Sequence, residues 1–205
     1  MNITIVGPGN VGGSLAVAFL KAGHSVLFGV KDKNIYFKGK ELADQFGFSY
    51  LNIDEAVSKS EIIVISVPAQ FAADVAKGLG NVSDKIIIDT MNSAFIKPGL
   101  YNNTADAILA NCNCTNVVKC FNTTGFENLA DPIYKGEGID MFMAGSSVKA
   151  KKIAQQLSKE IGFANCFDFG GNENFYALEQ LAFAWINLAI LQKHGRDLAF
   201  KLIKR

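Results

Sequence analysis

Short apolar runs of strand length alternate along the chain with segments whose apolar residues recur at helical spacing. The two clearest runs, EIIVISV and KIIIDT, are rich in β-branched residues, as expected for parallel strands buried on both faces. Further strands are predicted over residues 3–6, 25–30, 116–121, 140–144 and 166–169. Helices are predicted over 12–22, 41–46, 54–59, 104–110 and 148–161, and over a segment that ends near 79.

Repetition of strand, helix and strand predicts right-handed crossovers and a doubly wound, mostly parallel sheet. The fold class is therefore α/β of the Rossmann type. After Gly170 and Gly171 the pattern is helical only. We expect a dinucleotide-binding domain over 1–169. The segment 170–205 is then a small carboxyl-terminal helical appendage that is too short to fold alone and packs on the domain or on a partner subunit.

A glycine-rich loop follows the first predicted strand and opens the first predicted helix. It fits the pattern G-x-G-x-x-G, and its setting between strand and helix is what makes the pattern specific for a dinucleotide. The first glycine makes the tight turn, the second lets the pyrophosphate approach the backbone, and the third allows close packing of helix and strand. The predicted loop consists of Gly7, Pro8, Gly9, Asn10, Val11 and Gly12.

The end of the second strand indicates which dinucleotide is bound. Enzymes that use NAD usually place an acidic residue there to bind the ribose hydroxyls. This chain instead has Lys31 and Lys33, which can meet a 2′-phosphate as point charges. The pattern favours NADP, and Asp32 between the lysines keeps NAD possible. An ordinary solvated turn is the alternative for the two lysines.

Ligands of doubly wound sheets bind beyond the carboxyl ends of the strands, where the strand order switches. Residues at three such ends supply small apolar walls and a few polar groups for a flat ring. For Val67 and Pro68 simple strand termination is the alternative, and for 122–124 the alternative is a cap on a following helix. The cofactor-binding residues expected here are Ser66, Val67, Pro68, Met91, Asn92, Asn122 and Thr123.

Composition and charge exclude other classes. A formal net charge of +1 argues against nucleic acid as a partner. The opening MNITIVGPGN lacks the basic start of a secretion signal, and the late apolar segment is too short to span a bilayer, so we expect a cytoplasmic protein without membrane contact. The four cysteines and two histidines, His24 and His194, lack the spacing of a metal site, and neither histidine is expected to be catalytic.

Several segments together resemble the NADPH-dependent deazaflavin (coenzyme F420) oxidoreductases and their bacterial relatives. They are GPGNVGGSLA, VISVP, IDTMN, VVKCFNTT and LEQLAFAWINLA, and of these VVKCFNTT is the most specific. The resemblance implies hydride transfer between NADP(H) and a flavin or deazaflavin held face to face in one cleft. Such chemistry needs no side-chain nucleophile, so no catalytic residue is expected.

The chain departs from this family at one point. The family usually has Gly-Ser-Arg where this chain has Gly29, Val30 and Lys31, so the usual Ser and Arg ligands of the 2′-phosphate are replaced. Relatives also occur in organisms without deazaflavin, so a common flavin or an iron-linked acceptor is an alternative. Two other functions stay open: reduction of a small imine or keto acid, although 170–205 is short for the helical domain of such enzymes, and dinucleotide binding without turnover.

The predicted tail helix, residues 174–192, is apolar on much of its circumference. Its main stripe includes Phe175, Leu178, Ala182, Trp185 and Ala189, and a second apolar flank runs beside it. We expect a symmetric homodimer in which this helix covers a neighbour, with packing against its own sheet as the alternative.

Overall fold

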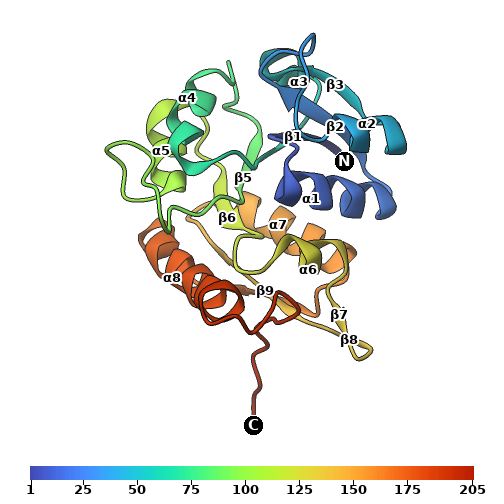
Figure 1. Ribbon diagram of the computed structural model, residues 1–205. Coiled ribbons are helices and arrows are strands. Elements are labelled where there is room, and N and C mark those ends of the chain that lie inside the picture. Colours follow the sequence, from blue (N-terminus) through green and yellow to red (C-terminus); the bar gives the residue numbers. More distant parts are fainter.

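The computed structural model describes residues 1–205 and contains one eight-stranded sheet with helices on both faces (Figure 1). The strand order is β10-β9-β6-β5-β4-β1-β2-β3, and neighbouring strands are parallel except for the antiparallel pair β6 and β9. This confirms the predicted mostly parallel α/β fold. The strands are β1 (Asn2–Val6), β2 (Ser25–Val30), β3 (Ser49–Asn52), β4 (Ile62–Ile65), β5 (Ile86–Asp89), β6 (Val117–Cys120), β9 (Asp140–Ala144) and β10 (Asn165–Asp168).

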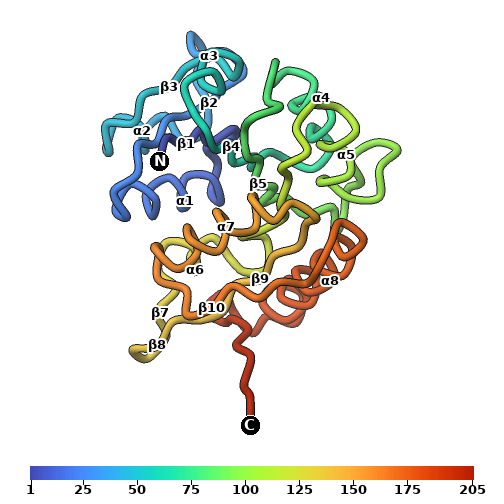
Figure 2. The backbone as a smooth tube through the Cα atoms, turned by 180° about the vertical axis from the view of Figure 1, so that it is seen from behind, coloured from blue at the N-terminus to red at the C-terminus, as the bar shows by residue number.

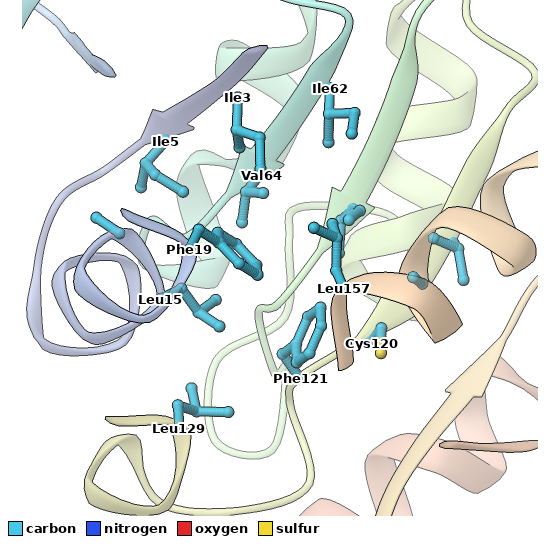
Figure 3. Close-up of a cluster of buried hydrophobic side chains, with 14 of the residues drawn as sticks. Ile3, Ile5, Leu15, Phe19, Ile62, Val64, Cys120, Phe121, Leu129 and Leu157 are labelled. Carbon is cyan, nitrogen blue, oxygen red and sulfur yellow. The ribbon is translucent and has the colours of Figure 1, made fainter. Parts of the chain in front are cut away.

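The β-branched runs are buried on both faces, as their composition predicts. In β4, Ile62 and Val64 point into one apolar cluster, whereas Ile63 and Ile65 point into another. Figure 3 shows the first cluster, in which side chains of β1 and β4 meet Leu15 and the ring of Phe19. Two cores on opposite faces hold the sheet rigid, so the loops at the carboxyl ends of its strands start from fixed positions.

The helices occupy the predicted segments with small shifts of their ends, except for the short helix Phe126–Ala130, which was not predicted. Gly47 ends α2 with a left-handed φ of +72°, as expected of a glycine stop. Two smaller features differ from expectation: α3 begins one residue before Asp54, so Asp54 lies in its first turn, and the short strand β3 was not predicted. The helices of the sheet domain are α1 (Asn10–Lys21), α2 (Lys40–Phe46), α3 (Ile53–Ser58), η1 (Ala69–Phe71), α4 (Ala72–Lys77), α5 (Thr104–Asn111), α6 (Phe126–Ala130) and α7 (Val148–Glu160).

A small hairpin that sequence reasoning missed, β7 (Ile133–Tyr134) and β8 (Glu137–Gly138), projects away from the sheet (Figure 1). Its strands have two residues each, too few to show an alternating pattern.

None of the helices is long and apolar enough to cross a membrane.

The tail forms one nearly continuous helical stretch made of η2 (Asn172–Asn174), α8 (Phe175–Ile186) and the π-helical turn η3 (Asn187–Leu191). Figure 2 shows α8 alongside β9 at the end of the sheet. Phe175 and Leu178 are fully buried in a cluster with Phe142 of β9. The packing of this helix on its own sheet, which was the alternative expectation, is therefore what the structure shows. Its outer side remains exposed at Tyr176, Leu188, Ile190 and Leu191.

Candidate dinucleotide site

The glycine loop lies at the switch in strand order, between β1 and β4. Gly7 has a φ of +89°, and a Cβ built on it would lie 2.5 Å from the carbonyl oxygen of Ser66 and 2.7 Å from Val67. Only glycine fits so close to the end of β4. The structure thus brings together two predicted parts of the site, the glycine loop and the residues that follow β4.

The other two glycines of the motif have different surroundings. A Cβ on Gly12 would lie 2.4 Å from the Gly7 carbonyl oxygen, which is the close packing of helix on strand that the motif predicts. A Cβ on Gly9 would meet nothing nearer than the Lys38 Cδ at 4.0 Å. The space above Gly9 is open, and Gly9 directly precedes α1, whose first-turn N–H groups have no partners within the helix. This cradle fits the pyrophosphate of a dinucleotide.

Lys38 was not among the predicted residues, yet its side chain lies beside Gly9. The neighbouring Gly39 has a φ of +102°, and a Cβ there would lie 2.2 Å from the Pro8 carbonyl oxygen. This contact holds the segment before α2 against the glycine loop and brings a lysine to the open space. The run Lys38, Gly39 and Lys40 in a polar segment was the only sequence signal.

The two predicted 2′-phosphate lysines are not equivalent. Lys33 is engaged within the protein, because its Nζ lies 2.8 Å from Oε2 of Glu55 and its N–H donates to Oδ1 of Asn52. Lys31 is exposed directly after β2 and makes no ion pair. Lys31 is therefore the freer of the two cations at this strand end.

Asn92 and Asn122 join the carboxyl ends of β5 and β6. Nδ2 of Asn92 donates to the Asn122 carbonyl oxygen at 2.7 Å, and Nδ2 of Asn122 donates to Oδ1 of Asn92 at 2.8 Å. Asn122 is only 3% exposed, and its own Oδ1 has no hydrogen-bond donor. A buried acceptor without a partner is costly, so this atom is suited to an amide donor of a ligand.

Phe121 sets the position of this pair. It is fully buried with a φ of +64°, a conformation that costs a bulky residue about 1–3 kcal/mol. This φ turns the chain at the end of β6. The ring of Phe121 packs edge-on against that of Phe19, with 6.0 Å between ring centroids, and this packing offsets the cost (Figure 3). The N-cap of α6 is Gly125 and not one of residues 122–124, so the alternative role of 122–124 as a helix cap is wrong.

The remaining predicted residues divide into accessible and buried ones. Val67 and Ser66 are half-buried and Pro68 is exposed after β4. Met91 is 4% exposed and packs in the core, and Thr123 is 2% exposed with its hydroxyl 3.6 Å from the Met141 sulfur. Met91 and Thr123 therefore offer a ligand no free side chain, and their contribution is to shape the two strand ends.

A fully buried lysine beside this site was missed. Nζ of Lys119 lies 2.7 Å from Oδ2 of Asp89, 2.7 Å from Oγ1 of Thr104 and 2.9 Å from the Met91 carbonyl oxygen. It also lies 2.9 Å from Oε1 of Glu179 in α8. The group ties β5, β6, α5 and α8 together directly behind Asn92. A lysine inside the β-branched strand segment VVKC was the available signal, since buried lysines require partners.

The cysteines are buried or half-buried, and Cys120 is the last residue of β6. Cys120 and Cys166 are buried with their sulfurs 4.0 Å apart, and burial raises the pKa of Cys120 well above its ordinary value. His24 is buried 2.9 Å from Glu160 of α7, whereas His194 is exposed in the tail. Neither histidine adjoins the glycine loop.

The glycine loop at the switch point of a doubly wound sheet defines a dinucleotide-binding protein of the Rossmann class. Residues 2–93, somewhat less than half of the chain, match the model of the family described as NADP oxidoreductase, coenzyme F420-dependent. The resemblance stated from the sequence is thereby confirmed. Members of this family are NAD(P)-dependent oxidoreductases.

Two curated relatives are similar to the chain in sequence. The chain is 25% identical over 209 residues to the F420-dependent NADP reductase of Methanothermobacter thermautotrophicus, a match that covers 93% of this chain and 90% of the relative. It is also 29% identical over 100 residues to the glycerol-3-phosphate dehydrogenase [NAD(P)+] of a Thermoanaerobacter species. That match covers 43% of this chain and only 30% of the dehydrogenase.

Among solved structures, a protein of Arthrobacter sp. FB24 provisionally described as an F420-dependent NADP reductase has the same fold. The TM-score is 0.86 at 22% identity, and the match covers 100% of both chains. The tail helices are thus part of a fold that is shared over its full length.

Proposed function

We propose that this protein transfers hydride between NADP(H) and a flavin or deazaflavin acceptor. The observation that carries the proposal is the open space above Gly9, at the amino terminus of α1 and at the switch in strand order. The family match over residues 2–93 and the relative from Methanothermobacter thermautotrophicus support the choice of cofactor and acceptor class.

Each part of the site has a role in this proposal. The N–H groups of the first turn of α1 bind the pyrophosphate, and the ammonium of Lys38 adds a positive charge beside it. Lys31 binds the 2′-phosphate, whereas Lys33 is paired with Glu55. Asn122 accepts a hydrogen bond from a carboxamide through its unpartnered Oδ1, which orients the nicotinamide ring.

A nicotinamide dinucleotide supplies the hydride, so the protein contributes position and exclusion of water. Ser66 and Val67 on one side and the bonded pair Asn92 and Asn122 on the other mark the two walls between which the rings meet. The pair is rigid because each amide bonds the other residue.

Steady-state oxidation of NADPH tests the proposal, with riboflavin, FMN, a deazaflavin and ferric complexes as acceptors. We expect turnover with a flavin or deazaflavin and its loss in Gly9→Glu, which places a bulky anion where the pyrophosphate binds. Gly78→Ala is the matched control, because a Cβ there makes only ordinary contacts at 3.5 Å. Tight NADPH binding without turnover on any acceptor would instead support a non-catalytic dinucleotide-binding module.

We also propose that the protein forms a homodimer through the outer side of its tail helix. The inner side packs on β9, yet Leu188, Ile190 and Leu191 leave an apolar strip exposed at the end of η3. Closed twofold pairs are the commonest way in which such a strip is covered.

A further inference from the structure

Buried charges contact the chain on both sides of Asn92, which forms part of the proposed nicotinamide site. The carbonyl oxygen of Met91, the residue before it, accepts a hydrogen bond from Nζ of Lys119 at 2.9 Å. The N–H of Ser93, the residue after it, donates to Oε2 of Glu179 at 3.3 Å, and the Ser93 hydroxyl donates to the same oxygen. An ammonium and a carboxylate are therefore each bonded to the chain within one residue of Asn92.

These charges do not cancel. The ammonium of Lys119 is shared by two carboxylates, since it lies 2.7 Å from Oδ2 of Asp89 and 2.9 Å from Oε1 of Glu179. Asp89 and Lys119 are fully buried and Glu179 is 5% exposed. Two formal negative charges and one formal positive charge leave one negative charge in excess. The pair of Lys119 and Asp89 is balanced by itself, so the excess is the charge that Glu179 brings from α8.

The other charged groups near Glu179 are less buried. Asp106, Glu173 and Lys97 line an adjoining open cavity of about 700 Å³ together with Glu179. Lys97 and Glu173 are exposed and Asp106 is half-buried, so solvent screens their charges. Glu179 is the buried one of these four groups, and its charge therefore acts on the strand ends with the least screening.

A negative charge beside a nicotinamide ring distinguishes its two redox forms. The ring has a formal positive charge when oxidised and none when reduced. Coulomb attraction therefore stabilises bound NADP+ relative to bound NADPH. The same difference lowers the reduction potential of the bound couple, by about 30 mV for each factor of ten in the ratio of the two dissociation constants.

We propose that Glu179 sets the redox preference of the dinucleotide site, favouring the oxidised ring and thereby making bound NADPH a stronger hydride donor. The inference rests on the proposed function, because it concerns the nicotinamide that the site is proposed to hold. Glu179 acts through its field and takes no part in bond making or proton transfer.

Calorimetric titration of the protein with NADP+ and with NADPH tests this role without turnover. We expect Glu179→Gln to raise the ratio of Kd for NADP+ to Kd for NADPH by about threefold to tenfold, the effect of one partly screened unit charge. Glutamine keeps the shape of the side chain and an oxygen that accepts from Ser93. A purely structural role would weaken the binding of both forms alike and leave the ratio unchanged.

Two controls separate charge from position. Glu160→Gln removes a carboxylate that pairs with His24, next to the amino end of β2, and should leave the ratio unchanged. Ser93→Ala removes the hydrogen bonds to Glu179 but keeps its charge, so the ratio should again stay the same. Ser93→Lys places an ammonium beside Glu179 in a half-buried position and should raise the ratio, which provides a test even where Glu179→Gln does not fold.

The outcomes distinguish this inference from the proposed function. A raised ratio in Glu179→Gln and in Ser93→Lys, with both controls unchanged, supports it. An unchanged ratio in folded Glu179→Gln, or an equal change in Ser93→Ala, overturns it and leaves the proposed function intact, because both redox forms still bind. Failure of the unchanged protein to bind either NADP+ or NADPH overturns both.

Discussion

The ammonium of Lys119 lies 2.7 Å from the carboxylate of Asp89, and neither side chain has any exposed surface. The pair connects β6 to β5 immediately before the residues that form the proposed nicotinamide site. Thr104 and Glu179 also contact the ammonium of Lys119 and extend the connection to α5 and α8. The position of the tail helix and the shape of the strand ends therefore depend on the same buried charge.

Replacement of this lysine should be strongly destabilising. We expect Lys119→Met to lower the free energy of unfolding by about 3–5 kcal/mol, because Asp89 would remain buried without its cation. Urea denaturation measures the loss. The double variant Lys119→Met, Asp89→Leu should recover only part of it, since the charge of Asp89 is then removed as well whereas the buried carboxylate of Glu179 still lacks its cation. A double variant as unstable as the sum of its single changes would show that the pair is not the source of the cost.

Two glycines of the loop should respond differently to the same substitution. Gly12→Ala should destabilise the protein by about 1–3 kcal/mol, because its Cβ would lie 2.4 Å from the Gly7 carbonyl oxygen. Gly9→Ala should change stability by less than about 1 kcal/mol and weaken NADPH binding, since its Cβ enters the open space. Thermal unfolding and calorimetric titration separate the two effects. Unchanged affinity in a folded Gly9→Ala protein, and also in Gly9→Glu, would contradict the site.

Cofactor choice should depend on Lys31. Lys31→Glu should lower the affinity for NADPH about tenfold more than that for NADH, because only NADPH has a 2′-phosphate and a charged hydrogen bond is worth about 1.5–3 kcal/mol. Titration with both cofactors measures the ratio. Lys77→Glu, at the end of α4, is the control for net charge. A ratio that does not change would make Lys31 a solvated turn residue.

Alkaline pH should destabilise the fold through Cys114. Burial raises the pKa of this thiol from 9.0 to about 11, so the folded state favours the neutral form. The sign follows: this contribution to stability is complete below pH 9.0 and is lost as the pH rises through about 11. Urea unfolding of the protein and of Cys114→Ala between pH 8 and 11 checks it. The difference between the two should shrink with rising pH, and parallel curves would contradict the assignment.

The proposed dimer predicts a particle of twice the chain mass of 22.1 kDa in light scattering at micromolar concentration. Ile190→Glu should shift the particle to a monomer, because it places a charge in the exposed strip of η3. Leu202→Glu, in the exposed tail beyond it, should not. A monomer with full activity in the unchanged protein would exclude an obligate dimer.

The sequence determined the fold class and the placement of the glycine loop. Continuous β-branched runs are typical of a sheet covered on both faces, and G-x-G-x-x-G between a strand and a helix predicts the tight turn of a dinucleotide loop. These are local constraints, readable from neighbours along the chain. They also placed Ser66, Asn92 and Asn122 correctly at strand ends.

Only the tertiary structure decided which of these residues are free to bind and what surrounds them. Lys33 is engaged by Glu55, 22 positions away, and Lys38 reaches Gly9 only because Gly39 packs on the backbone of Pro8. Likewise, Lys119 and Glu179 meet across β6 and α8, and the pocket beside them is formed by segments far apart in sequence. Pairings over such separations depend on how the elements pack, because no local pattern of the chain encodes which distant side chain completes a buried charge.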